Sequence, residues 1–402
     1  MTLGPTPYAD GVSDAPPPPT GPTSSGPTPS GPASSGPAWS DPPTSTADDD
    51  ARLGRRYATL VVAGVSLVAL TCVAFLLPAP YVTMRPGPAF DTFGEIGGEE
   101  MFTFGDDVRT YPVDGAIDFT TVSVTRADTR LSLGDVVQAY FSPDVAVVPR
   151  EVVYSDDVSA EESRDAGQAQ LTSSIDSSRV AALRAAGFEV GETPVVAGVV
   201  PDGAADGLLE ADDEVVSVDG EPAATSAAVV AAIGELEPGD TVTLGVVRDG
   251  EERDVEVTTR PDPDDPEVPR VGITLGTSYD FPFDVTNHVG DQVGGPSAGT
   301  MFALAIYDRL TPGSLTGGRT VAGTGTITPD GQVGPIGGIR QKMAGASSAG
   351  AEVFLVPEAN CAEAAEGDDH GLRLVSVTTL DEAIDDLEAL AADPDADVRG
   401  CA

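Results

Sequence analysis

An uncharged, apolar run of 20 residues from Ala58 to Leu77 constrains this chain more than any other feature. A helix rises roughly 1.5 Å per residue, so a helix over the run is about 30 Å long and matches the hydrocarbon core of a bilayer. A cleaved signal peptide has a shorter apolar run that lies nearer the N-terminus, whereas this run begins more than 50 residues into the chain. The sequence therefore predicts a transmembrane helix over 58–77.

Arginines flank the run unequally. Arg52, Arg55 and Arg56 precede it, and only Arg85 closely follows it. Basic residues are retained on the cytoplasmic side of a membrane. The chain is therefore predicted to cross the cell membrane once, with a cytoplasmic N-terminus and an extracytoplasmic part that begins after Leu77.

Composition limits the partners and cofactors. The 402 residues have a formal net charge of −44 at pH 7, so no nucleic-acid partner is expected, and 40% hydrophobic residues suffice for two or three domains. The three cysteines and two histidines show no ligand-like spacing, so the sequence predicts no metal and no cofactor. Residues 1–50 are rich in Pro, Gly, Ser and Thr, and they are predicted to be a disordered cytoplasmic tail.

A glycine-rich turn presents a serine in Gly294-Gly295-Pro296-Ser297-Ala298-Gly299-Thr300. Glycines beside Ser297 let the backbone approach a ligand and leave amide N–H groups free at a helix start, which suits an oxyanion. The segment is equally consistent with a structural role, in which Ser297 is the N-cap of a helix over 298–308.

Lys342 is the only lysine in a chain with 21 basic residues, and it ends the segment Gly337-Gly338-Ile339-Arg340-Gln341-Lys342. A bias towards arginine explains why the other basic residues are arginines, but it does not explain why this lysine is present. Arginine keeps its proton in proteins, whereas a buried lysine becomes neutral and acts as a general base towards a serine hydroxyl.

These two segments resemble the proteolytic domain of the Lon family, whose Gly-Pro-Ser-Ala-Gly serine and Gly-Gly-x-x-x-Lys lysine form a Ser–Lys dyad. The resemblance implies that Ser297 is the nucleophile, Lys342 is the base and Thr324 positions the lysine. It makes Gly295, Pro296 and Ala298 supporting residues of the serine turn. Further matching segments are Val321-Ala322-Gly323-Thr324-Gly325-Thr326-Ile327-Thr328, Gly331-Gln332-Val333-Gly334-Pro335-Ile336, Ala349-Gly350-Ala351 and Phe354-Leu355-Val356-Pro357.

Two departures refine the resemblance. Gly294-Gly295 stands where ATP-dependent Lon has Asp-Gly, and Thr326 stands where it usually has Glu. The chain after residue 57 is more similar to the membrane-anchored, PDZ-containing Lon-like proteases of Gram-positive bacteria. That similarity implies protein or peptide substrates and homo-oligomers, because Lon-type domains commonly form hexameric rings. Lys342 also lacks the glycines and hydroxyl residue of a phosphate-binding loop, so the chain is expected to work without ATP.

Two other serine chemistries would need different partners for Ser297. A Ser-His-Asp triad would need His288 or His370, and the position of His288 nine residues before Ser297 leaves that alternative open. The Ser-x-x-Lys arrangement of penicillin-recognising enzymes would need a serine at 339, where this chain has Ile339, so that class is excluded.

The segment over 187–260 resembles a bacterial PDZ domain. The resemblance is carried by Val195-Val196-Ala197-Gly198-Val199-Val200, by Gly203-Ala204-Ala205, by the stretch from Leu209 to Gly220, and by a hairpin turn at Asp249-Gly250. PDZ domains bind extended C-terminal peptides on a sheet edge. Gly187-Phe188 is the candidate carboxylate-binding loop, although a structural Gly-Phe turn is an equally good interpretation.

The fold class predicted for the whole chain is α+β. After the transmembrane helix we expect a β-rich membrane-proximal region over 81–175, the PDZ domain over 187–260 and a Lon-type α/β proteolytic domain over 271–392. Cys361 and Cys401 are the two cysteines of the extracytoplasmic part, and there we expect them to pair, with two unpaired thiols as the alternative.

These features predict a membrane-anchored, ATP-independent serine endopeptidase that uses a Ser–Lys dyad, with a PDZ domain that recruits or gates protein substrates. The alternative is a catalytically inert PDZ adaptor that binds peptide C-termini at the membrane. The joint presence of Ser297, Thr324 and Lys342 favours the enzyme.

Overall fold

The computed structural model describes residues 46–96, 98–126, 128–154, 159–290 and 293–401, without the side chains of 46–52 and 160. The tail predicted over 1–50 falls almost wholly outside the described residues. Helix α1 spans Thr46–Leu76, and its segment Leu53–Leu76 is long and apolar enough to cross a membrane by length and composition. A helix is therefore present where the apolar run predicts one.

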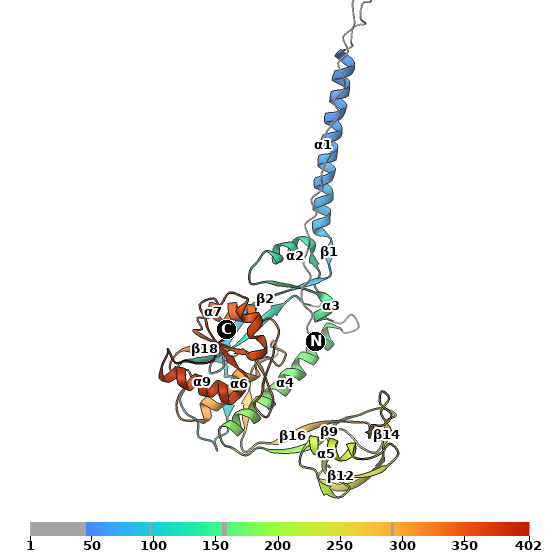
Figure 1. The fold of residues 1–402 in the computed structure, drawn as a ribbon, viewed down its shortest axis with the longest axis vertical. Helices are drawn as coiled ribbons and strands as arrows, with labels where there is room; N and C mark the ends of the chain where they lie inside the picture. The colour runs from blue at the N-terminus through green and yellow to red at the C-terminus, as the bar shows by residue number, and fades with distance from the viewer. Residues whose placement is uncertain (1–45, 97, 127, 155–158, 291–292, 402) are drawn as a thin grey trace, which may run out of the picture. The chain divides into compact units, whose positions relative to one another are not determined.

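A six-stranded mixed sheet forms the centre of the part that follows α1, with the order β22-β21-β18-β6-β2-β8 (Figure 1). Strands β22, β21, β18 and β6 run parallel, β2 pairs antiparallel with β6, and β8 pairs antiparallel with β2. The strands are Arg373–Val377 (β22), Val353–Pro357 (β21), Thr320–Gly323 (β18), Ala116–Val124 (β6), Tyr81–Asp91 (β2) and Ala146–Pro149 (β8).

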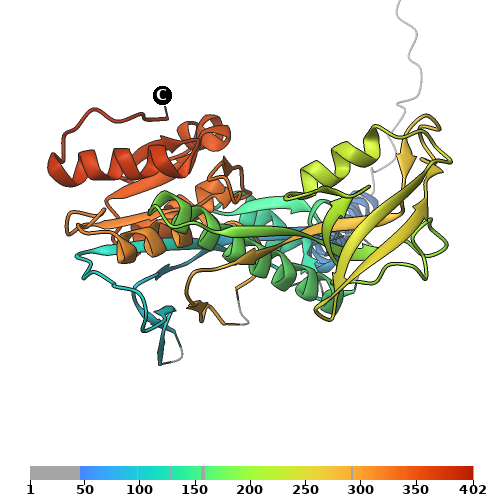
Figure 2. The same ribbon diagram turned by 90° about the horizontal axis from the view of Figure 1, so that it is seen from below.

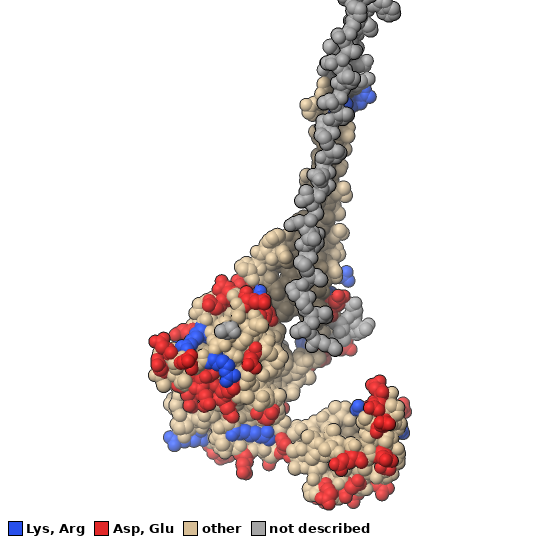
Figure 3. All heavy atoms as spheres, viewed as in Figure 1, with Lys and Arg blue, Asp and Glu red and all other residues tan. Residues whose placement is uncertain are grey.

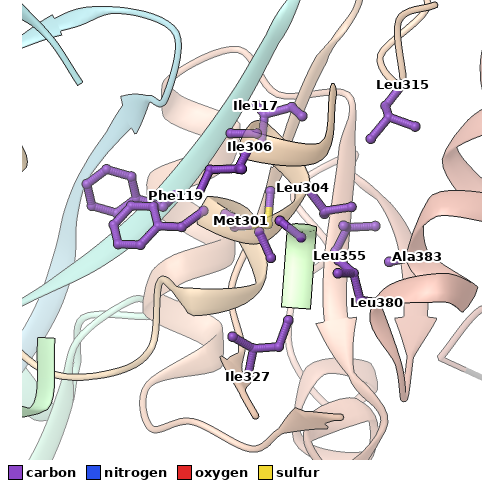
Figure 4. Close-up of a cluster of buried hydrophobic side chains, with 14 of the residues drawn as sticks. Ile117, Phe119, Met301, Leu304, Ile306, Leu315, Ile327, Leu355, Leu380 and Ala383 are labelled. Atoms are coloured by element: carbon purple, nitrogen blue, oxygen red, sulfur yellow. The ribbon is translucent and has the colours of Figure 1, made fainter. Parts of the chain in front are cut away.

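Apolar side chains cover both faces of this sheet. Successive residues of a strand point to opposite faces. Val321 and Leu355 therefore pack in the larger core with α6, whereas Ala322 and Phe354 pack in a second core with α7. Figure 4 shows the larger core, in which Met301 and Leu304 of α6 lie among residues of the sheet and of α9. The helices are Gly299–Leu310 (α6), Ile339–Ser348 (α7), Cys361–Ala365 (α8) after a 3-10 turn at Glu358–Asn360, and Leu380–Ala392 (α9).

Strands from the predicted membrane-proximal region, 81–175, belong to this same sheet. β6 pairs with β18 on one edge and with β2 on the other, so residues before the PDZ domain are joined to residues after it. Helix α4, Ala160–Ala185, packs against α6. Shorter elements of this part are β1 (Pro78–Ala79), β7 (Leu131–Ser132), α2 (Leu133–Tyr140), α3 (Arg150–Val153), β3 (Glu95–Ile96), β4 (Glu99–Glu100), β5 (Phe102–Phe104), β17 (Val285–Asn287), β19 (Thr326–Ile327) and β20 (Val333–Gly334).

A second sheet has the order β13-β12-β10-β9-β16 and a core of its own, to which Val229 of α5 contributes (Figure 2, yellow-green). The predicted hairpin turn at Asp249-Gly250 is confirmed, since Arg248 pairs with Glu251. Its elements are β9 (Gly191–Val199), β10 (Glu214–Val218), β11 (Glu221–Pro222), α5 (Ser226–Gly234), β12 (Thr241–Arg248), β13 (Glu251–Thr258) and β16 (Ile273–Asp280), with β14 (Arg260–Pro261) and β15 (Pro269–Arg270) paired beside it.

Candidate active site

Ser297 lies in the turn that leads into α6, and its hydroxyl is not used to cap the helix. Gly295 has φ +87°, a conformation that favours glycine, and it brings the chain around to the helix start. The N-cap position belongs to Ala298, and no side chain caps the helix. The structural alternative for Ser297, an N-cap role, is therefore wrong, and its hydroxyl oxygen contacts a lysine instead.

Lys342 approaches Ser297 from α7, on the opposite face of the sheet from α6. Its side chain is 2% exposed, and its Nζ lies 2.8 Å from Ser297 Oγ, 2.9 Å from Thr324 Oγ1 and 3.1 Å from the carbonyl oxygen of Thr120. The three residues that resemblance to Lon proteins singles out, Ser297, Lys342 and Thr324, are thus brought together. The Thr120 carbonyl is an additional partner.

The protons at this cluster can be assigned from the partners. The Thr324 hydroxyl donates to the carbonyl oxygen of Ser297 at 2.9 Å, so its oxygen is left to accept a proton from Lys342. A neutral amine has two N–H donors and one lone pair. The donors match Thr120 O and Thr324 Oγ1, and the lone pair is left for the Ser297 hydroxyl proton. The geometry therefore suits a neutral lysine that accepts from the serine.

Burial favours that neutral form. Desolvation lowers the pKa of Lys342 from its ordinary 10.5 to about 7. A buried ammonium loses hydration that carbonyl and hydroxyl oxygens replace only in part, and no carboxylate is among the causes of its shift. At neutral pH a substantial fraction of Lys342 is thus able to act as a base.

Helix α4 holds the serine turn from outside. The Gly295 N–H donates to Gly167 O at 2.9 Å, Gln168 Nε2 donates to Val293 O at 2.9 Å, and Ser174 Oγ donates to Pro296 O at 3.0 Å. Close approach explains the glycine after Ala298, because a Cβ on Gly299 would lie 2.7 Å from Ser174 Oγ. Three α4 residues thus fix the backbone of the turn.

A cleft of about 420 Å³ opens at Ser297. Strand β18 ends opposite Phe119, so the same edge of β6 from Thr120 to Val124 has no strand partner among the described residues. The cleft is lined by this edge, by Pro88 and Phe90 of β2, by the turn at 293–298 and by Lys342. An extended peptide laid along β6 would pass Ser297.

The two histidines lie elsewhere. His288 Nδ1 is 3.3 Å from Glu99 Oε2, and its Nε2 is 3.4 Å from Thr103 Oγ1. His370 Nε2 is 3.4 Å from Asp144 Oδ1. Among the described residues, neither imidazole contacts Ser297. A Ser-His-Asp triad requires such a contact, so the structure does not support one.

Gly187 and Phe188 lie at the C-terminal end of α4. Gly187 has φ +85° and follows α4, where Gly187 N–H donates to Arg184 O and Phe188 N–H donates to Leu183 O. This pattern is the usual glycine C-cap of a helix. The Phe188 ring packs on Phe283 at 5.1 Å, against the larger core.

An apolar groove of about 320 Å³ instead lies between α5 and the outer strand β16. It is lined by Val230 and Ile233 of α5, by Val268–Gly272 and by Ile273 and Leu275. β16 pairs with β9 on one edge, and its other edge faces the groove. The short segment Val271-Gly272-Ile273 could have marked this site in the sequence, because a glycine between apolar residues begins the edge strand.

The cysteines predicted to pair are disulfide-bonded in the structure. The bond joins Cys361, at the start of α8, to Cys401 and closes a loop with a sequence separation of 40. Both residues pack against the core beneath α7.

Comparison with known proteins assigns the two folded parts. Family models match a PDZ domain over residues 169–259 and the C-terminal proteolytic domain of Lon protease over residues 284–390. The chain carries a PDZ domain followed by a Lon-type proteolytic domain. The predicted α+β class and order of domains are confirmed.

Relatives match the Lon-type domain over limited lengths. Lon protease of Geobacter metallireducens is 40% identical over 97 residues, which is 24% of this chain and 11% of that protein. Lon protease 1 of Bacillus subtilis is 34% identical over 119 residues, or 28% of this chain and 15% of that protein. The chain therefore spans only a small part of the length of these curated relatives. The PDZ domain of an SdrC-like protein from Listeria monocytogenes is 25% identical, with a TM-score of 0.19, over 20% of this chain and 85% of that one.

Proposed function

We propose that this chain is a membrane-anchored serine endopeptidase that cleaves proteins or peptides without ATP, with Ser297 as nucleophile and Lys342 as general base. One observation carries the proposal: a fully buried lysine, with its pKa near 7, lies 2.8 Å from a serine hydroxyl at the end of a cleft. A serine is a weak nucleophile until a base removes its proton, and this contact supplies the base.

In the proposed reaction neutral Lys342 takes the Ser297 hydroxyl proton while Ser297 Oγ attacks the carbonyl carbon of the scissile peptide bond. The lysine ammonium then gives the proton to the leaving amine as the C–N bond breaks. Water attacks the acyl-enzyme ester, its proton passes to Lys342, and the carboxylic product leaves as Ser297 is reprotonated. Thr324 and the Thr120 carbonyl hold Nζ in place through both steps.

The oxyanion is proposed to be held by backbone amides of the serine turn. Among the hydrogen bonds of the described residues, the N–H groups of Ser297 and Ala298 have no acceptor. The Gly295 N–H is already bonded to Gly167, and Pro296 has no N–H. Free amides beside the nucleophile stabilise charge that develops on the substrate carbonyl oxygen.

We assign the cleft at Ser297 and the groove beside α5 to substrate binding. The free edge of β6 at 120–124 is proposed to add the cleaved segment as a strand, and the groove between α5 and β16 is proposed to take an apolar C-terminal peptide. The PDZ domain would then recruit the substrate, gate the dyad, or do both. Assembly into rings, as Lon-type domains commonly form, belongs to the same proposal.

Sidedness rests on the arginines before α1 and on the cysteines after it. Arg52, Arg55 and Arg56 favour a cytoplasmic N-terminus, and a disulfide between Cys361 and Cys401 fits an oxidising compartment outside the membrane. The proposed location is the cell membrane, with the PDZ and proteolytic domains extracytoplasmic.

Replacement of Lys342 by arginine tests the dyad. Arginine keeps the positive charge but does not become neutral, so Lys342→Arg should abolish peptide hydrolysis as completely as Ser297→Ala does. Arg340 lies on the same helix with an exposed side chain paired to Glu366, so Arg340→Lys is the matched control and should retain activity. Substantial activity in folded Lys342→Arg protein would refute the dyad, and an inactive wild-type protein would favour the inert adaptor.

A further inference from the structure

Exposed large hydrophobic side chains after α1 fall into two groups. One group lies in the PDZ domain and the segment that follows it, at Val200, Leu208, Val216, Val230 and Val268. The described residues from 159 to 199 and from 269 to 401 contain none. The other group lies between the end of α1 and α3, and it comprises Leu77, Tyr81, Leu133, Tyr140, Phe141, Val152 and Val153.

The second group is attached directly to the end of α1. The N–H of Leu133, the first residue of α2, donates to Leu77 O at 2.9 Å, and Leu77 is the first residue after α1. β1 follows Leu77 and pairs with β7, which leads into α2. On the other side, the N–H of Arg150 in α3 donates to Pro80 O at 3.0 Å. The first residues of α2 and α3 are therefore hydrogen-bonded to residues that directly follow α1.

Helix α2 has an apolar face whose C-terminal end is exposed. Leu133, Val137, Tyr140 and Phe141 follow the i, i+4, i+7, i+8 spacing of one helix face, and Tyr140 and Phe141 are 75% and 79% exposed. Their rings contact each other edge to face at 5.6 Å. Asp135 is the one charged residue of α2, whereas in Figure 3 acidic residues cover much of the proteolytic domain.

We propose that this surface, formed by Leu77, Tyr81, α2 and α3, lies in the interfacial layer of the bilayer that α1 crosses. The inference rests on the proposed membrane anchoring and deepens it. A span that ends at Leu77 places the residues bonded to Leu77 at the level of the lipid headgroups. Tyrosine and phenylalanine on an amphipathic helix are the residues that bind this layer, because one side is apolar and the other is wet.

A cavity beside the helix end fits the same partner. It has a volume of about 270 Å³ and is lined by Pro78–Tyr81, Thr129, Arg130 and Arg150. Arg130 is exposed, and both arginines lie beside the first residues after the span. The Arg130 guanidinium at that level is placed to contact the phosphates of anionic lipids, in a chain with a formal net charge of −44.

Such an orientation limits how far Ser297 and Lys342 lie from the bilayer. β2 runs from Tyr81 to Ala89, which pairs with Thr120, and Thr120 O is bonded to Lys342. Eight residues of strand at about 3.3 Å each span about 26 Å. The cleft at Ser297 would therefore be held within a few tens of ångströms of the bilayer, where extended segments of membrane-tethered proteins reach it.

The test uses the full chain in lipid vesicles with a single tryptophan as probe. Trp39 is the only natural tryptophan, so Trp39→Phe provides the background. Tyr140→Trp then reports on α2, Val65→Trp on α1, and Val216→Trp, on an exposed strand position of the PDZ domain, serves as the aqueous control. Emission is quenched with lipids brominated near the headgroup or in the acyl chain, and separately with aqueous acrylamide.

We expect headgroup-proximal bromine to lower emission at position 140 about twofold, with a blue shift, and to leave position 216 unchanged. Acrylamide should quench position 216 strongly and position 140 weakly. Phe141→Trp is the second probe if Tyr140→Trp fails to fold, and it carries the same expectation.

The remaining outcomes separate the two proposals. If brominated lipid quenches the tryptophan at 65, but only acrylamide quenches the tryptophan at 140, the inference is overturned and the anchoring stands. No lipid quenching at 65 would overturn the anchoring and the inference together. Protection of 140 from both quenchers would mean that a second copy of the chain covers α2, which also overturns the inference.

Discussion

Replacement of Lys342 by methionine should stabilise the proteolytic domain at pH 6, and this gain should shrink and then disappear as the pH rises towards 9. The folded chain holds Lys342 with a pKa of about 7, against an ordinary 10.5. Between these values the unfolded chain binds a proton that the folded chain does not, so the stability of the wild-type protein rises with pH across this window. Methionine has a similar volume and no proton to lose, so the stability of Lys342→Met does not change with pH through this residue.

The magnitude follows from the shift. A difference of about 3.5 pKa units corresponds to about 5 kcal/mol that the wild-type fold lacks at low pH, at 1.36 kcal/mol per unit. The same relation leaves about 5 kcal/mol at pH 6 and about 2 kcal/mol at pH 9. Methionine also loses the contacts to Thr120, Ser297 and Thr324, about 1 kcal/mol each, but that loss is nearly the same at both pH values. The stability of Lys342→Met relative to wild type should therefore fall by about 3 kcal/mol from pH 6 to pH 9.

Hydrogen exchange of the amides in α7 and β18 measures this local stability in the full chain, with intrinsic rates corrected for pH. Arg340→Met, at an exposed position of the same helix, is the control and should show no such trend. The same pKa predicts that kcat/KM of the wild-type enzyme falls about tenfold per unit below pH 7 and is level above it. A gain from Lys342→Met that is constant or grows from pH 6 to pH 9 would refute the argument that burial keeps this lysine neutral.

Three further predictions concern the rest of the molecule. Protease added to intact cells should remove the PDZ and proteolytic domains and leave the N-terminal tail, whereas protection of these domains on immunoblots would contradict the proposed sidedness. Cys401→Ala should lower the free energy of unfolding by about 3 to 4 kcal/mol, because it opens a loop with a separation of 40; thermal unfolding that is unchanged by the substitution would argue against a stabilising bond. Gly345→Ala should lower the melting temperature, because its Cβ would lie 2.6 Å from Gly87 O and overpacking costs about 1 to 3 kcal/mol, whereas Gly337→Ala, with nothing within 4 Å, should be nearly neutral.

Local features of this chain were predictable from its sequence. The apolar run predicts the helix that the structure has as Thr46–Leu76, and Asp249-Gly250 predicts the turn between β12 and β13. In each case the signal lies within a few neighbouring residues. Gly187-Phe188 shows the limit of such signals, because a glycine followed by an aromatic residue suits a helix C-cap as well as a carboxylate-binding loop. The tertiary partners of Phe188 decide between them, and the sequence does not contain those partners locally.

The sequence did not predict that strands before the PDZ domain pair with strands after it. β6 and β18 are hydrogen-bonded neighbours, yet about 200 residues and the whole PDZ domain separate them along the chain. No periodicity within 81–175 indicates that its strands extend a sheet formed by 320–377. The strand content of this region was therefore predictable, and its place in the fold was not.

The position of β6 in the sheet also determines which groups surround Lys342. The match to the Lon proteolytic domain begins at residue 284, but one of the two acceptors for the Lys342 N–H groups is a backbone carbonyl at Thr120. A carbonyl belongs to every residue type, so the sequence carries no mark of this role, and no side-chain substitution at 120 removes it. The Thr120 side chain has a separate function, since its hydroxyl donates to Gly323 O and ties β6 to β18 beside Thr324. The environment of Lys342 is therefore assembled from both sides of the PDZ domain, and residues 271–392 alone do not contain it.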